Sequence, residues 1–199
     1  KEDDAPRTYA RVMKFFVIAC CFMFLFISLY INVFAWFFLA IHKPAWVEGL
    51  SIVPLLALGN IFLGIYYNLS IWYKLTHKNM IGAAITFAGA AITIVLNILL
   101  IPRYHYTGAA IATFSCYLFM MITSYVLGQK YYPVPYARKK LLAYIVLVVL
   151  MYLTHLGLTH LYNNRWFDLG LATALLAFFT VFVMKIEKRE INLILGRSL

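Results

Sequence analysis

NMIGAAITFAGAAITIVLNILLIP at residues 79–102 and YHYTGAAIATFSCYLFMMITSYVLGQ at residues 104–129 are two uncharged stretches separated by one residue, Arg103. A helix needs about 20 apolar residues to cross the hydrocarbon core of a bilayer. Each stretch exceeds that length, and Pro102 and Arg103 leave little chain between them. The two stretches therefore predict a membrane-spanning helical hairpin.

Four further stretches of the chain contain no Asp, Glu, Lys or Arg. They cover residues 15–41, 49–73, 141–164 and 169–184. The first three are as long as the two halves of the hairpin, and the last is the shortest, with 16 residues. The pattern predicts an all-α, polytopic membrane protein with six transmembrane helices.

The basic residues predict the orientation of these helices. Fourteen of the 17 Lys and Arg residues lie in the two tails and in the second and fourth gaps between the uncharged stretches. The first, third and fifth gaps hold one each: Lys43, Arg103 and Arg165. Because positive charge is retained on the cytoplasmic side, both ends of the chain are predicted to be cytoplasmic. An even number of helices requires the same arrangement.

The composition narrows the classes of partner. Hydrophobic residues make up 64% and charged residues 12%, which is too apolar for a soluble domain of this size. The net charge of +10 comes from residues that flank the uncharged stretches, so anionic membrane lipids are the expected partner rather than nucleic acid. Cys20, Cys21 and Cys116 lie inside predicted helices and match neither a disulfide framework nor a zinc spacing. We expect no cofactor and no metal.

The same features divide the chain into five parts. We expect a cytoplasmic tail or loop at 1–14, a four-helix unit at 15–129, a basic cytoplasmic loop at 130–140, a terminal helix pair at 141–185 and a cytoplasmic tail at 186–199. The polar opening residues lead directly into a helix, which favours the C-terminal part of a longer transporter. A complete six-helix protein trimmed at its start is the alternative.

Five polar residues are candidates for lining a substrate path: Asn60, Asn68, Lys74, Asn97 and Arg103. The first two lie in a helix interrupted by proline and glycine, as helices along transport paths often are, although such residues are also common in membrane helices generally. The Asn amides either bind sugar hydroxyls or tie helices together. The two cations either meet a pyrophosphate or only set the orientation of the helices.

Catalytic constellations are not evident in the sequence. No predicted helix interior contains Asp or Glu, and Asp168 is separated from His155 and His160 by a predicted loop. An enzyme is therefore not expected. Ion-coupled transport commonly uses an intramembrane carboxylate, so any coupling is predicted to use residues outside this chain or a different mechanism.

NILLIPRYHYTGAAIAT at residues 97–113 resembles a recurrent hairpin of the polysaccharide-exporter branch of the multidrug/oligosaccharidyl-lipid/polysaccharide superfamily. Its usual form is a helix ending in Asn, Ile-Pro, a short turn with an aromatic residue and glycine, and Gly-Ala-Ala-Ile-Ala-Thr. The turn glycine is replaced here by residues 104–106. PLLALGNIFLG at residues 54–64 and the basic loop are also similar, and the resemblance extends from about residue 9 to 188.

The resemblance implies a flippase that moves undecaprenyl-pyrophosphate-linked oligosaccharide units for O-antigen, capsule or exopolysaccharide across the bacterial inner membrane. Such carriers have about fourteen helices and work by alternating access. The six helices here would be the last four of the second lobe and the terminal pair. The missing N-terminal helices of the same transporter would then be partners of this chain.

Two other functions stay open on the residues. A drug or cation antiporter of the same superfamily would be expected to have an intramembrane carboxylate facing its cavity. An integral-membrane enzyme of glycan or lipid metabolism would need a histidine and a carboxylate on one membrane face, and His155 and His160 are its best candidates.

Overall fold

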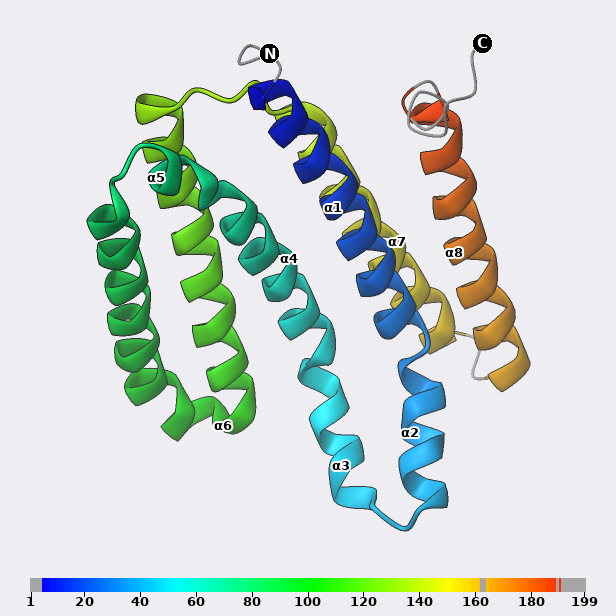
Figure 1. Cartoon of the computed structure of the whole chain (residues 1–199). Coiled ribbons are helices and arrows are strands. Elements are labelled where there is room, and N and C mark those ends of the chain that lie inside the picture. The colour runs from blue at the N-terminus through cyan, green and yellow to red at the C-terminus, as the bar shows by residue number, and fades with distance from the viewer. Residues whose placement is uncertain (1–4, 162–163, 189, 191–199) are drawn as a thin grey trace.

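The computed structural model describes residues 5–161, 164–188 and 190, and over these residues the secondary structure is entirely helical (Figure 1). The helices in chain order are α1 (Ala5–Leu29), α2 (Ile31–Ala40), α3 (Pro44–Gly49), the 3₁₀ helix η1 (Leu50–Ile52), α4 (Val53–Leu69), α5 (Ile71–Leu75), α6 (Asn79–Tyr131), α7 (Arg138–Leu161) and α8 (Arg165–Ile186). The predicted all-α class is confirmed.

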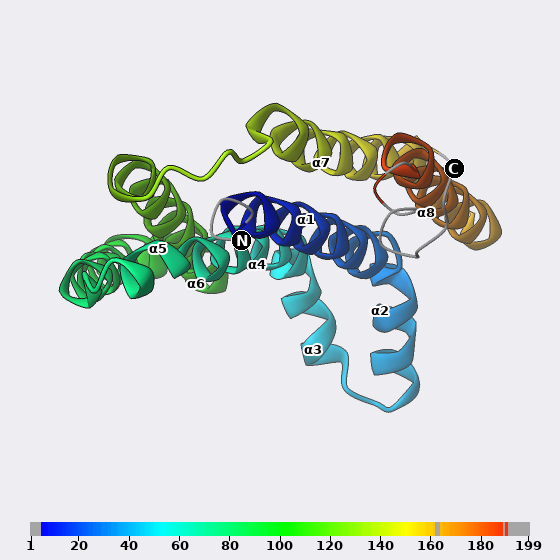
Figure 2. The same ribbon diagram turned by 45° about the horizontal axis from the view of Figure 1, so that its top comes forward.

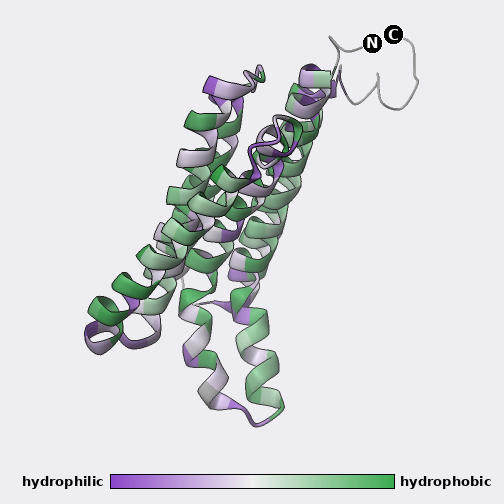
Figure 3. Cartoon of the chain, turned by 60° about the vertical axis from the view of Figure 1, so that its left-hand side comes forward, coloured by the Kyte–Doolittle hydropathy of each residue, from purple (hydrophilic) through white to green (hydrophobic). Residues whose placement is uncertain are grey.

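Five helical segments of the described chain are long and apolar enough to cross a membrane. They are α1, the run Trp46–Leu75, α6, α7 and α8. Most of their residues are hydrophobic, as Figure 3 shows, and many of their large hydrophobic side chains are exposed on the outside of the bundle. Such surfaces are unfavourable in water and favourable in lipid, so the fold is that of a membrane-embedded protein.

Helix α6 is 53 residues long but reverses direction near its middle. His105 has φ 48° and ψ −128°, and 26 residues lie on either side of it. The two halves run side by side in opposite directions (Figure 1), and Gly89 of the first half faces Met120 and Cys116 of the second. The chain therefore forms the predicted hairpin by a reversal at a single residue.

Two predicted helices are broken in the structure. The stretch 15–41 forms α1 and α2, which meet at Tyr30 with φ −95° and ψ 18°. The stretch 49–73 begins after α3 and continues through α4 and α5. Pro54 lies in the first turn of α4, where its missing N–H removes no helical hydrogen bond, so it starts a helix rather than kinking one. Helices α2 and α3 bend away from the layer formed by the other helices (Figure 2).

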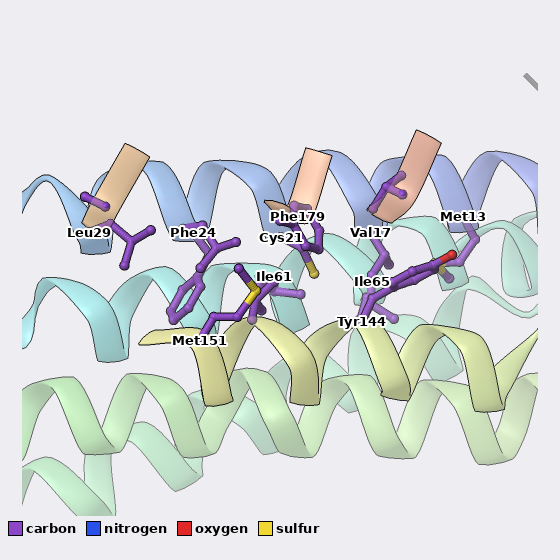
Figure 4. Close-up of a cluster of buried hydrophobic side chains, with 14 of the residues drawn as sticks. Met13, Val17, Cys21, Phe24, Leu29, Ile61, Ile65, Tyr144, Met151 and Phe179 are labelled. Carbon is purple, nitrogen blue, oxygen red and sulfur yellow. The ribbon is translucent and has the colours of Figure 1, made fainter. Parts of the chain in front are cut away.

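Helix α1 is the centre of the main hydrophobic core. Its buried residues recur every three or four positions, so they lie along one side of the helix. They pack against residues from α4, α7 and α8 (Figure 4). The core residues are Met13, Val17, Cys21, Phe24, Leu25, Leu29, Ile61, Ile65, Leu69, Tyr144, Val148, Met151, Ala172, Phe179 and Val183. A second cluster joins α4 and α5 to α6, where Trp72 Nε1 donates to Ser124 Oγ at 3.2 Å.

The hairpin leaves no room for a side chain at Gly108. A Cβ there would lie 2.6 Å from the backbone carbon and oxygen of Leu100. We therefore expect Gly108→Ala to destabilise the protein by about 1–3 kcal/mol, the usual effect of overpacking, because the two halves must move apart. Reversible unfolding in detergent or lipid nanodiscs measures the effect.

Gly170→Ala on α8 is the matched control for this substitution. A Cβ at Gly170 would meet nothing within 4 Å, and alanine is the better helix former, so this variant should gain about 0.5–1 kcal/mol. Equal effects at both positions would contradict the close approach of the hairpin halves.

Candidate functional site

The structure does not bring the five predicted path residues into one pocket. Asn60 is exposed and borders a groove of ≈350 Å³ between α1 and α4, together with Cys20 and Met23. Asn68 donates from Nδ2 to the Gly64 carbonyl of its own helix at 3.1 Å. Such a bond satisfies the amide locally and ties no second helix.

The other three path residues lie on α5 and on the first half of α6. Lys74 is exposed in the last turn of α5, and Arg103 is exposed beside the reversal at His105. Asn97 is half-buried, and its Oδ1 has no hydrogen-bond partner. Within residues 5–161, no hydrogen bond or ion pair joins any two of the five.

A different polar cluster lies where α2, α7 and α8 meet. Asn32 Nδ2 donates to Asp168 Oδ2 at 2.9 Å, and His155 Nε2 lies 2.9 Å from Asp168 Oδ1. His155 is 3% exposed and Asp168 8%. We call these three residues the Asp168 cluster. Through polar groups it joins α2 to the consecutive helices α7 and α8, which lie more than 100 residues later in the chain.

The Asp168 cluster has unfilled hydrogen-bonding capacity. Among the described residues, four buried side-chain atoms have no hydrogen-bond partner, and two of them are His155 Nε2 and Asp168 Oδ1. They are close enough for an ion pair, but their alignment does not satisfy a hydrogen bond. A third is Ser28 Oγ, and Ser28 lines the same cavity as His155. Buried polar atoms are nearly always paired, by protein groups or by ordered water, so these three atoms make the Asp168 cluster the candidate site.

Two cavities adjoin the Asp168 cluster. Asp168 lines the smaller, of ≈290 Å³, and His155 lines the larger, of ≈450 Å³. Asn32 and Thr159 line both. The two ionisable residues thus lie in the wall between two spaces, each large enough for several water molecules.

The smaller cavity also carries an aromatic ring and a cation. The guanidinium carbon of Arg165 lies 5.0 Å from the centre of the Trp36 ring, within the range of a cation–π contact. Both residues line this cavity beside Asp168. The cavity therefore offers a cation, an amide, a carboxylate and an aromatic face.

Helix capping places Asp168 inside a helix. Asn164 Oδ1 accepts from the Trp166 N–H at 3.0 Å, so α8 begins at Arg165 and Asp168 belongs to its first turn. Asp168 thus lies in the first turn of α8 rather than in the predicted loop, because α8 begins four residues before the uncharged stretch 169–184 does. Asn164 followed four residues later by an acidic residue is a helix-start pattern, and that signal could have identified the site.

A second polar cluster lies at the opposite end of α8. Glu187 accepts from Lys14 Nζ at 2.6 Å, from the Tyr144 hydroxyl at 2.7 Å and from Lys140 Nζ at 3.2 Å. Lys14 also lies 2.6 Å from Glu190. We call Lys14, Lys140, Tyr144, Glu187 and Glu190 the Glu187 cluster. Glu187 is 1% exposed, so the surrounding donors are what keep its charge stable.

Opposing influences act on the Glu187 carboxyl. Burial raises its pKa, but the hydrogen bonds from Lys14, Tyr144 and Lys140, together with the charge of Lys14, outweigh burial and hold the pKa below its ordinary value of 4.5. The carboxylate is therefore stabilised in its charged form by the folded protein.

The two clusters are separated by about the thickness of a bilayer. Lys14 and Asn32 are 18 positions apart and Asp168 and Glu187 are 19 positions apart, which corresponds to about 27–29 Å along a helix. The hydrocarbon core of a bilayer is about 30 Å thick. The spacing of the two polar clusters therefore matches the spacing of the two edges of a membrane.

The Glu187 cluster predicts an acid-sensitive contribution to stability. A carboxyl whose pKa is lowered on folding stabilises the protein fully above its ordinary pKa of 4.5, and the contribution is lost as pH falls through the folded pKa. We expect the melting temperature in nanodiscs to fall below about pH 4.5, and Glu187→Gln to reduce that fall.

Glu48→Gln is the control for this measurement, because Glu48 is exposed on α3 and far from the cluster in the chain. It should keep the acid sensitivity of the unmodified protein. A melting profile in Glu187→Gln that is identical to the unmodified one would contradict the assignment.

Comparison with known proteins returns no relative. No family model, no curated protein and no solved structure matches the chain. What can be inferred about function comes from the sequence motifs and from the geometry of the hairpin and the two clusters.

Proposed function

We propose that this chain is the C-terminal part of a flippase that moves lipid-linked oligosaccharide units across the bacterial inner membrane. The substrate class is an undecaprenyl-pyrophosphate-linked unit for O-antigen, capsule or exopolysaccharide. Transport occurs by alternating access, with two lobes rocking about a hydrated cavity and without any covalent step. The resemblance of residues 97–113 to the polysaccharide-exporter hairpin is the observation that carries this proposal.

The geometry of the hairpin supports that resemblance. The family's turn has a glycine where this chain has residues 104–106, and His105 adopts a positive φ that glycine reaches without strain. Gly108 opens the Gly-Ala-Ala-Ile segment and contacts the Leu100 backbone too closely for any side chain. A positive φ at His105 is the backbone conformation that a turn glycine would favour, which supports the resemblance.

The proposed carrier has six spans in this chain, because the two halves of α6 each cross the membrane. Fourteen of the 17 basic residues then lie on the cytoplasmic side with both ends of the chain. The Glu187 cluster faces the cytoplasm, near anionic lipid headgroups, and the Asp168 cluster faces the outside. Residues 15–129 belong to a transporter lobe, and residues 141–185 form the terminal pair.

The remaining helices of the transporter complete the substrate path in this proposal. Asn60 borders an open groove, and Lys74 and Arg103 are exposed, so all three are free to face helices outside these 199 residues. The missing N-terminal helices supply the opposite wall of the cavity. This chain contributes one polar wall and the helices that support it.

The Asp168 cluster gives weight to two other functions. A drug or cation antiporter needs a buried carboxylate near its cavity, and Asp168 is one. An integral-membrane enzyme of glycan or lipid metabolism needs a histidine and a carboxylate on one face, and His155 lies 2.9 Å from Asp168. The flippase is preferred because it also accounts for the hairpin.

Complementation tests the proposal directly. The full-length protein that contains this chain should restore polymer export in a bacterial strain that lacks its own oligosaccharide flippase. Accumulated lipid-linked oligosaccharide, measured by mass spectrometry, should fall at the same time. Drug resistance that depends on an ion gradient, without any restored export, would favour the antiporter. Loss of a glycan- or lipid-modifying activity on combined replacement of His155 and His160 would favour the enzyme.

Cysteine labelling tests the six spans. In a background in which Cys20, Cys21 and Cys116 are replaced, single cysteines at Lys43 and Arg103 should react with a membrane-impermeant thiol reagent added outside intact cells. Single cysteines at Lys74 and Lys139 should react only after the cells are opened. Protection of Arg103→Cys from the outside reagent would mean that α6 does not cross the membrane twice.

A further inference from the structure

We infer that His155 and Asp168 form a proton-binding site whose occupancy sets how tightly α7 and α8 hold together. Neither the hairpin nor the proposed substrate path requires such a site. His155 Nε2 and Asp168 Oδ1 are buried and lie 2.9 Å apart, at ion-pair distance, but neither atom makes a hydrogen bond.

The chemistry of these two atoms makes their contact depend on a proton. A carboxylate oxygen is an acceptor only, and an imidazole nitrogen without hydrogen is also an acceptor. Two bare acceptors at 2.9 Å repel each other, so the contact needs a hydrogen on Nε2 or on the carboxyl. A second proton on the ring makes an imidazolium, which strengthens attraction to the Asp168 carboxylate at this low-dielectric position. Loss of protons weakens the contact between α7 and α8.

The surroundings contain no stronger partner for either group. Helix α2 contributes only the Asn32 amide, which already donates to Asp168 Oδ2. Tyr30, at the junction of α1 and α2, contacts Thr173 of α8 at 2.8 Å. The other titratable or charged groups nearby are Tyr152 and His160 on α7, beside the larger cavity, and Arg165 on α8, beside the smaller one. In the described part of the chain, the only ion pair made by Asp168 is with His155.

The two cavities supply a path for the proton. Asp168 lines one and His155 lines the other, so water in either cavity comes close to one member of the pair. Histidine is the side chain whose ordinary pKa lies nearest to physiological pH, and small changes around it move its charge. Burying an ionisable pair inside a membrane protein costs free energy. Pairs of this kind are therefore commonly functional, and proton relay is one of their common functions.

The first test follows the proton on the protein itself. Four of the five histidines are replaced by His42→Asn, His77→Asn, His105→Asn and His160→Gln; asparagine suits the first three because each has a positive φ. Ring ¹⁵N NMR of this protein in nanodiscs then reports His155 alone. We expect the ring signals to change with the number of protons on the ring as the pH is lowered, and Asp168→Asn to alter that change because the facing carboxylate is lost.

The second test follows the helices. Spin labels are attached at Leu156→Cys on α7 and Ala174→Cys on α8, both exposed positions, in the background without native cysteines. The distance between the labels should increase as the pH rises and the contact between His155 and Asp168 loses its proton. His155 fixed in one protonation state from pH 5 to 9 would overturn the inference. Titration of the ring without any change in the label distance would overturn it as well.

Coupling of this site to transport rests on the proposed function and has its own readout. In the full-length carrier, export should depend on external pH, and His155→Gln or Asp168→Asn should reduce export and remove that dependence on pH. His42→Asn, at the same side of the membrane but away from the pair, should export normally. If the unmodified carrier restores no export, the flippase proposal fails, and the NMR and spin-label tests still decide the proton site. Normal, pH-dependent export in both variants would limit the pair to a structural role and overturn the coupling.

Discussion

Two polar contacts at opposite ends of α8 hold it against the first helices of the chain, and the arrangement of the bundle depends on them. Lys14 bonds Glu187 at one end, and Asn32 bonds Asp168 at the other. Between these ends, α8 contributes Ala172, Phe179 and Val183 to the core around α1. Apolar side chains drive little specific association in lipid, because lipid chains are equally apolar. The polar contacts at the two ends therefore set the register of α8 relative to α1.

The architecture was largely predictable from the sequence because the physical requirement behind it is simple. A bilayer demands long uncharged helices, and runs without Asp, Glu, Lys or Arg identify them. The hairpin at 79–129 was predictable because Arg103 is the only charged residue in that range. Helix ends were less predictable. Tyr30 breaks the first helix without proline or glycine, and α1 begins ten residues before the uncharged stretch does, because charged residues are good helix formers outside lipid.

The candidate site could not be predicted in the same way. Asn32, His155 and Asp168 come from three helices, and Asn32 is separated from the other two by more than 120 positions in the chain, so no local pattern joins it to them. The five path residues were chosen for polarity within or beside single helices, and polarity does not determine which side chains meet. Asn68 illustrates the difference, since its amide bonds Gly64 in its own helix. Only the capping of α8 by Asn164 offered a sequence signal, because it places Asp168 in the first turn.

The spacing of the two clusters has a consequence for the membrane in which this protein works. Lys14 and Glu187 at one end, and Asn32 and Asp168 at the other, are tied in pairs across neighbouring helices. A single helix adapts to a thicker or thinner bilayer by tilting, at a modest energetic cost. Here, α8 cannot tilt alone without breaking a buried polar contact at one end. Hydrophobic mismatch must then be absorbed by tilt of the whole bundle or by deformation of the lipid, so that the host bilayer's thickness becomes a determinant of stability.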